Sequence, residues 1–216
     1  MSAKSLHRGG LLLTLLAAVA APASAQSGRT SFFLTSSGPG SGAELTGVAG
    51  ADNHCTVLAA NAGLPERAWR AYLSVTATDS TPAVNARDRI GTGPWYNYSG
   101  VLVAGTIEQL HGENNLDKVT ALTENGDVVN GRGDSPNQHD ILTGSRADGT
   151  AFPPGEDTTC SNWTSRGAGS ARVGHHDRNG GGEDPTSWNS AHLSRGCGQE
   201  DLQGTGGNGY FYCFGI

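Results

Sequence analysis

The sequence predicts an α+β fold in which small mixed sheets and two short helices carry long loops. Glycine makes up 33 of the 216 residues, more than twice the usual share of about 7%, and this excess favours turns over long helices. Only 16% of the residues are charged, which excludes a coiled coil or a long helical bundle. The 36% of apolar residues is enough to build a packed core in a chain of this length.

The first half of the chain begins with a strand pattern followed by a helical pattern. Residues 31–35 are predicted to form a strand, because β-favouring residues there end at the turn-forming residues 36–40. A helix is predicted from an N-cap at Asp52 as far as Gly63, which ends it. Its apolar side chains recur at helical spacing and form one stripe: Cys55, Leu58, Ala59 and Ala62.

A second strand is predicted over residues 68–76 and a second short helix over residues 83–90. The apolar side chains of the strand occupy alternate positions, the period of a half-buried strand: Trp69, Ala71, Leu73 and Val75. From residue 91 onward polar and glycine-rich connections separate short apolar runs, so we expect loops on a small sheet. The runs are residues 141–142, 160–164, 171–173 and 210–214.

The N-terminus has the pattern of a secretory signal peptide. Lys4 and Arg8 give it a basic start, residues 11–20 are apolar, and residues 23–25 are the small-x-small sequence that signal peptidase cuts after. A retained membrane anchor is the alternative, but the apolar run is short and no second one follows. We therefore expect residues 1–25 to be removed, which leaves residues 26–216 as a single secreted or periplasmic domain without a stable membrane anchor.

Charge argues against nucleic acid as a partner. Without the signal peptide, 20 acidic residues stand against 12 basic ones, a net charge of −8. No cluster of lysine and arginine interrupts this balance, so nothing in the chain would neutralise a phosphate backbone.

Four cysteines remain in the expected mature chain: Cys55, Cys160, Cys197 and Cys213. An even number in an exported chain predicts two disulfides, with three possible pairings. Zinc is the competing interpretation of these cysteines, but they show no C-x-x-C spacing.

Several segments in a fixed order resemble endostatin, the C-terminal module of some collagens. They are residues 47–52 leading into Cys55, 63–64, 70–74, 84–88, 139–145 with 148–149, 159–164 and 210–213. The similarity spans nearly the whole mature chain. It implies a C-type lectin-like fold, with disulfides joining Cys55 to Cys213 and Cys160 to Cys197.

Calcium-dependent lectins of this fold carry a Glu-Pro-Asn-like triplet on a loop and a Trp-Asn-Asp triplet on a strand. Residues 188–190, Trp-Asn-Ser, are similar to the second, but a serine replaces the carboxylate; residues 183–185 only partly match the first. Calcium is therefore possible with an incomplete motif, since it prefers several ionised oxygens. The candidate ligand-binding residues are Glu183, Asp184, Trp188 and Asn189. Packing of Trp188 in the core is the competing interpretation.

His175, His176 and Asp177 are the densest local set of possible metal ligands. Adjacent residues on a strand point to opposite faces, so at most one of the two histidines can share a site with a given partner. The spacing matches no zinc motif, and polar loop residues beside a strand are the alternative. The zinc site of endostatin uses histidines at the very N-terminus, and residues 26–30 contain none.

Arg132, Gly133 and Asp134 form an Arg-Gly-Asp sequence, which resembles the adhesion motif that integrins bind. Glycine, serine and proline around it predict an exposed loop. A chance match is the competing interpretation in so glycine-rich a chain.

The sequence contains no short motif that is typical of an enzyme active site. Residues 204–209 match the dinucleotide-binding glycine pattern, but they precede a strand and no helix follows, so we expect a loop there. We expect a secreted, non-catalytic recognition module without a cofactor that binds an extracellular glycan or protein. The alternatives are a periplasmic or extracellular hydrolase, and adhesion through the Arg-Gly-Asp loop.

The signal pattern makes a direct prediction about the secreted protein. Mass spectrometry of the secreted material should find an N-terminus at Gln26, because signal peptidase cleaves after the small residues 23–25. An intact chain beginning at Met1 in a purified membrane fraction would contradict this.

Overall fold

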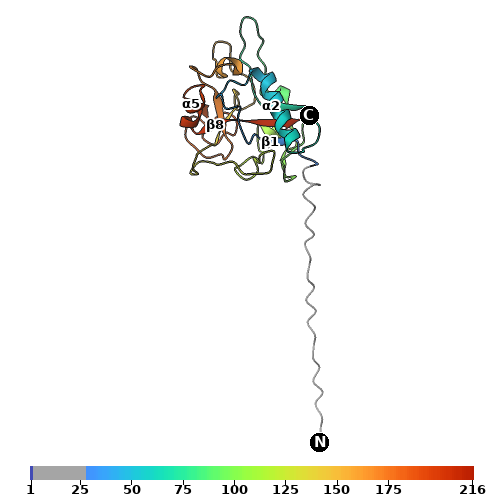
Figure 1. The fold of residues 1–216 in the computed structure, drawn as a ribbon. Helices are drawn as coiled ribbons and strands as arrows, with labels where there is room; N and C mark the ends of the chain where they lie inside the picture. The colour runs from blue at the N-terminus through green and yellow to red at the C-terminus, as the bar shows by residue number, and fades with distance from the viewer. Residues whose placement is uncertain (2–27) are drawn as a thin grey trace.

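A long C-terminal strand, β8 (Gly207–Gly215), runs through the middle of a mixed α+β fold in this computed structural model (Figure 1). The structure describes Met1 and residues 28–216. Apart from Met1, the expected signal peptide lies outside the described residues. Within them, no helix has the length and apolar character needed to cross a membrane.

The main sheet is assembled around β8 from both sides. Strands β1 (Phe32–Leu34) and β2 (Trp69–Ala71) pair antiparallel with its second half. Strand β5 (Asp140–Leu142) pairs with its first half in parallel. Residues from both ends of the chain therefore meet on one strand.

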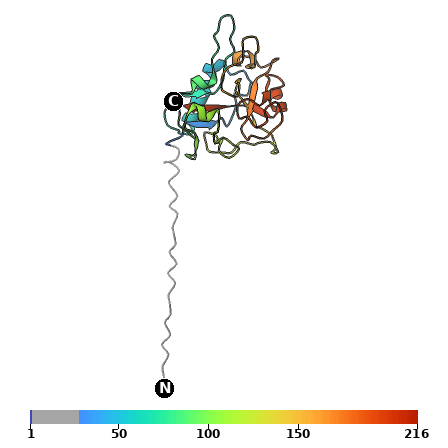
Figure 2. The ribbon, with the colours of Figure 1, turned by 180° about the vertical axis from the view of Figure 1, so that it is seen from behind.

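Two further strands extend the sheet beyond β5, in the order β1-β8-β5-β6-β7. Strand β6 (Arg172–His175) pairs antiparallel with β5, and β7 (His192–Leu193) pairs antiparallel with β6. Strands β3 (Trp95–Tyr96) and β4 (Leu102–Ala104) form a separate two-stranded sheet. Loops make up much of the outline in the view from behind (Figure 2).

Both faces of β8 are buried, which explains its nearly continuous apolar sequence. Phe211 and Cys213 pack into a core cluster with residues of the long helix α2 (Gly47–Asn61). Tyr212 and Phe214 point to the opposite face and pack into a second cluster. The strand thus separates two hydrophobic cores.

The other helical elements are short. They are η1 (Ala86–Arg89), α3 (Ile107–Leu110), α4 (Cys160–Trp163) and α5 (Gln199–Thr205). All four residues of α4 have positive φ angles, between 51° and 67°, so this turn is left-handed. Left-handed backbone costs about 1–2 kcal/mol for each residue with a Cβ. The turn is held by its own side chains, since Trp163 Nε1 donates to Ser74 O at 2.7 Å and Asn162 Nδ2 donates to Thr76 O at 3.1 Å.

The predicted strand at residues 31–35 is confirmed as β1, and the predicted helix is confirmed as part of α2. The N-cap assignment is wrong, because α2 begins at Gly47 and Asp52 lies inside it. The Asp52 carboxylate instead accepts hydrogen bonds from Ala71 N and from Arg89 Nη2, both at 2.8 Å. Asp52 therefore ties the helix to β2 and η1.

Three other predicted elements differ in extent. The strand expected at 68–76 ends at Ala71, because Leu73 N donates back to Ala71 O at 3.0 Å and turns the chain. The helix expected at 83–90 is the four-residue η1. Residues 204–209, expected to be a loop, are divided between the end of α5 and the start of β8.

Both disulfides implied by the resemblance to endostatin are present, and no described cysteine is free. Cys55 of α2 is joined to Cys213 of β8 across 158 residues, and Cys160 of α4 is joined to Cys197 across 37. Paired cysteines of this kind indicate an oxidising, extracellular type of environment.

Removal of the long bridge should cost more stability than removal of the short one. In the chain-entropy model the Cys55–Cys213 bridge contributes about 5 kcal/mol and the Cys160–Cys197 bridge about 4 kcal/mol, because the longer loop restricts the unfolded chain more. Urea unfolding of Cys55→Ala/Cys213→Ala, with Cys160→Ala/Cys197→Ala as the matched control, measures the difference. An equal or larger loss in the control would contradict the expectation.

Candidate functional site

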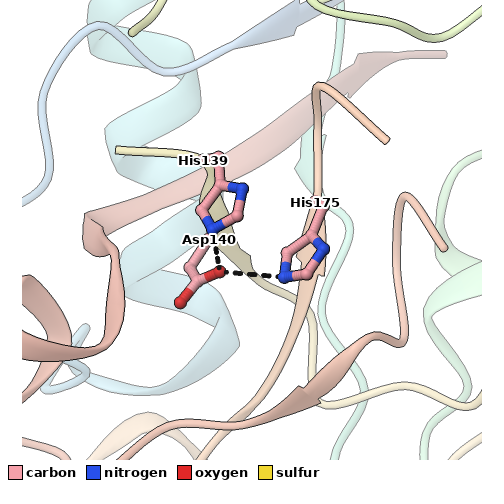
Figure 3. A group of neighbouring side chains, drawn as sticks. All are labelled: His139, Asp140 and His175. Carbon is pink, nitrogen blue, oxygen red and sulfur yellow. Dashed lines mark ion pairs between the residues drawn. The ribbon is translucent and has the colours of Figure 1, made fainter. Parts of the chain in front are cut away.

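Four polar side chains meet where strands β5, β6 and β7 lie side by side, and Figure 3 shows three of them. We call His139, Asp140, His175 and His192 the His/Asp cluster. The register of the sheet brings them together, because Asp140 is paired with His175, and His192 is paired with Val173, two residues before His175. Side chains two residues apart on a strand share a face.

The ring nitrogens of the cluster surround one carboxylate oxygen. The Nε2 atoms of His139 and His175 each lie 3.2 Å from Asp140 Oδ1 (Figure 3). His192 Nε2 lies 3.4 Å from the same oxygen and 2.9 Å from His175 Nε2. His139, Asp140 and His175 therefore each have a ligand atom within 4.8 Å of the other two, and His192 lies beside this group of three.

The opposite nitrogen of each ring is held by an acceptor outside the cluster. His139 Nδ1 donates to Asp177 Oδ1 at 3.2 Å, and His175 Nδ1 donates to the carbonyl oxygen of Pro185 at 2.8 Å. His192 Nδ1 lies 3.0 Å from the Leu193 carbonyl oxygen. Carbonyl and carboxylate oxygens only accept, so each Nδ1 carries the hydrogen. The Nε2 atoms of His175 and His192 lie 2.9 Å apart, so one of them must also carry a hydrogen, unless a cation lies between the two rings.

The cluster is buried, which makes its arrangement costly without a cation. The side chains of Asp140, His139 and His175 are 2%, 5% and 0% exposed, and that of His192 is 21% exposed. Neither carboxylate oxygen of Asp140 has a hydrogen-bond partner. A buried carboxylate is strongly destabilising unless a positive charge or a hydrogen-bond donor compensates it, and either a protonated imidazole or a bound cation would do so here.

Electrostatics keep the carboxylates of the site ionised. Burial raises the pKa of Asp140, but the facing imidazoles of His175 and His192 outweigh it and lower that pKa to about 2. Burial also opposes the ionisation of Asp177, yet contacts with His139 and with the backbone N–H of Arg132 hold its pKa well below the usual range. Asp140 in turn raises the pKa of His192. The site therefore attracts cations at neutral pH.

The sequence-predicted set His175, His176 and Asp177 is divided by the strand. His175 belongs to the cluster, whereas His176 points away and its Nε2 lies 3.2 Å from the carbonyl oxygen of Asn130. This confirms that adjacent histidines cannot share the site. Asp177 is an outer partner that orients His139. The sequence analysis missed His139, Asp140 and His192, which only the pairing of β5 and β7 with β6 brings together.

The predicted ligand-binding residues do not form a surface group. Trp188 is 3% exposed and packs against Tyr72, with ring centroids 4.8 Å apart. Asn189 is 1% exposed, and its Nδ2 donates to the hydroxyl of Tyr72 at 2.9 Å. Glu183 is exposed and forms an ion pair with Arg172 at 2.7 Å, and Asp184 is half-buried beside it. Ligand binding at these four residues stays a prediction.

The Arg-Gly-Asp loop is tied to the cluster. Arg132 and Gly133 are exposed, but the Asp134 carboxylate already accepts from Lys118 Nζ at 2.5 Å and from Gly131 N at 2.8 Å. The backbone N–H of Arg132 donates to Asp177 Oδ2 at 2.6 Å. Asp134 is therefore turned back onto the protein.

The donor atoms of the cluster are the main evidence for what the site does. His139, Asp140 and His175 bring ligand atoms within 4.8 Å of one another, and outer hydrogen bonds fix the rings of the two histidines. Such outer partners are a regular feature of metal-ligating histidines. No protein-family model matches the chain, and no curated protein matches it.

Proposed function

We propose that this chain is an exported, non-catalytic recognition module of the C-type lectin-like type, and that its His/Asp cluster binds a zinc ion. The observation that carries the zinc site is the convergence of three Nε2 atoms on Asp140 Oδ1. Zinc in proteins is commonly held by four such nitrogen and carboxylate ligands.

The spacing of three donor atoms supports a small ion. With zinc–ligand bonds of about 2.0–2.1 Å, the ligand atoms of a regular tetrahedron are about 3.3 Å apart. The Nε2 atoms of His139 and His175 each lie 3.2 Å from Asp140 Oδ1, and the ligand atoms of these three residues lie within 4.8 Å of one another. His192 lies outside this group of three, so its ring would have to move toward His139 to become the fourth ligand.

The donor set favours zinc over calcium. Calcium takes six to eight oxygen ligands, whereas three of the four atoms here are nitrogens. The calcium motif expected around Trp188 and Asn189 also loses support, because the amide of Asn189 is used inside the fold. Zinc at the His/Asp cluster therefore replaces calcium as the proposed ion.

The closed surroundings of the cluster support a structural role for the metal. Catalytic zinc sites keep a coordination position open for water or substrate, whereas structural sites have four protein ligands. Here the side chains of the three residues with mutually close ligand atoms are at most 5% exposed, and His192 beside them offers a fourth nitrogen. The ion would connect β5, β6 and β7 and so fix the loops between them.

Recognition of an extracellular glycan or protein is the second part of the proposal. The signal pattern and the two disulfides support export to an oxidising compartment. The resemblance to endostatin supports the C-type lectin-like fold, in which loops on a disulfide-linked scaffold present polar groups to a ligand.

Zinc binding can be tested on the metal-free mature protein by isothermal titration calorimetry. We expect one zinc ion per chain and a higher melting temperature, since a ligand at 100 times its Kd stabilises the folded state by about 2.7 kcal/mol. Asp140→Asn should weaken binding by more than about 100-fold, because it removes a direct ligand. His54→Gln, which changes a histidine of α2 outside the cluster, is the control. Absence of zinc binding, or equal affinity of Asp140→Asn and wild type, would refute the site.

Asp177, which orients His139 without being a ligand itself, provides a second test of the zinc site with a smaller expected loss of affinity. Asp177→Asn should lower zinc affinity by about 10–100-fold without changing the stoichiometry, because it weakens the hydrogen bond that orients His139. Asp184→Asn, a nearby acidic residue outside the cluster, should leave the affinity unchanged. Equal effects of the two variants would show that general negative charge, rather than orientation of the ring, controls binding.

A further inference from the structure

A polar pocket lies at the opposite end of β8 from the His/Asp cluster. Its volume is about 460 Å³, and it is formed by Gly28, Arg29, Ser31, Arg67, the loop at 90–96, and Gly215 with Ile216 at the end of β8. Asp140 pairs with Gly207 at the start of the strand, so the two regions are separated by about 26 Å along β8. Figure 1 shows this end of β8 beside β1 and α2, away from α5.

Two guanidinium groups line the pocket. Arg29 lies over the ring of Tyr96, with its central carbon 4.2 Å from the ring centroid. Arg67 approaches from the segment before β2, and its Nε is buried without a hydrogen-bond partner. Among the described residues neither arginine forms an ion pair with a carboxylate, and no aspartate or glutamate lines the pocket.

The backbone of the loop adds further donors. Ile90 has φ −105° and ψ 9°, and Gly91 follows with φ +78°. When a residue in the right-handed backbone region is followed by one in the left-handed region, their N–H groups point to the same concave side of the loop. Such an arrangement binds anions. In the described part of the chain, the N–H groups of Gly91, Thr92 and Gly93 have no protein acceptor.

Glycine is required at position 91 for two reasons. Its φ of +78° is one that L side chains rarely adopt, and a Cβ there would lie 2.8 Å from Ile216 Cγ2. The loop therefore depends on glycine at this position. The pocket combines two guanidinium groups with a loop whose N–H groups at residues 91–93 are unpaired within the described chain, and no aspartate or glutamate side chain is in its lining, which also includes Ile216.

We propose that this pocket binds an oxyanion, a carboxylate, sulfate or phosphate group carried by a small polar ligand. Guanidinium groups pair with such groups through two parallel hydrogen bonds, and the free backbone N–H groups supply additional contacts. The volume falls within the roughly 300–1,000 Å³ of small-molecule sites. Because the chain has a net charge of −6, the two arginines make the pocket a local positive exception on an acidic protein. The site is independent of zinc binding.

The test is a ¹⁵N–¹H NMR titration of the purified protein with sodium glucuronate, sodium sulfate and sodium phosphate, with glucose as the neutral counterpart of glucuronate. We expect saturable shifts of the Gly91, Thr92 and Gly93 amides with at least one anion and none with glucose. The anion with the lowest Kd then distinguishes a carboxylate from a sulfate or phosphate ligand. Shifts with none of the three anions, or equal shifts with glucose, would overturn the proposal.

Arginine variants link the shifts to the pocket. Arg67→Gln should weaken binding of the best anion at least about tenfold, the effect expected for one charged hydrogen-bond partner. Arg29→Gln changes an exposed side chain and gives the same test if Arg67→Gln lowers the melting temperature. Arg195→Gln, an exposed arginine outside the pocket, is the control and should bind like wild type. Unchanged affinity in both pocket variants, or an equal loss in Arg195→Gln, would overturn the proposal.

Discussion

The buried carboxylate of Asp140 is the constraint on which one side of the molecule depends. It lies 3.2–3.4 Å from nitrogens of three imidazole rings in the interior, so the packing of the surrounding strands depends on how its negative charge is compensated. The outer partners of the rings, Asp177 and the Pro185 carbonyl, belong to the loops after β6. The geometry of these loops is therefore coupled to the charge at the centre.

Strand β8 connects this region to the rest of the fold. Its first residues pair with β5 beside the His/Asp cluster, its middle carries Cys213, and its last residue lines the oxyanion pocket. Both faces of the strand are packed in hydrophobic core clusters. The two proposed sites therefore lie at opposite ends of one buried strand.

The sequence predicted helices and strands well where apolar residues recurred at a clear helical or alternating spacing. Strand β1, the apolar face of α2 and the mixed α+β class follow from such patterns. The role of Asp52 did not, because a mid-helix carboxylate that binds Arg89 looks like an N-cap from sequence alone. The His/Asp cluster was also beyond local patterns, since its members span residues 139–192 and meet only through strand register. Strand alternation did predict that His175 and His176 would separate.

The position of β8 in the chain has a consequence for biosynthesis. Its partners β1, β2 and β5, and the cysteine that pairs with Cys213, all precede it, so none of them can complete its pairing until β8 itself has been made. An incomplete nascent chain therefore has no central strand on which to fold. The pairing of β1, β2 and β5 with β8 is therefore a late step of folding, completed only after residues 207–215 have been synthesised.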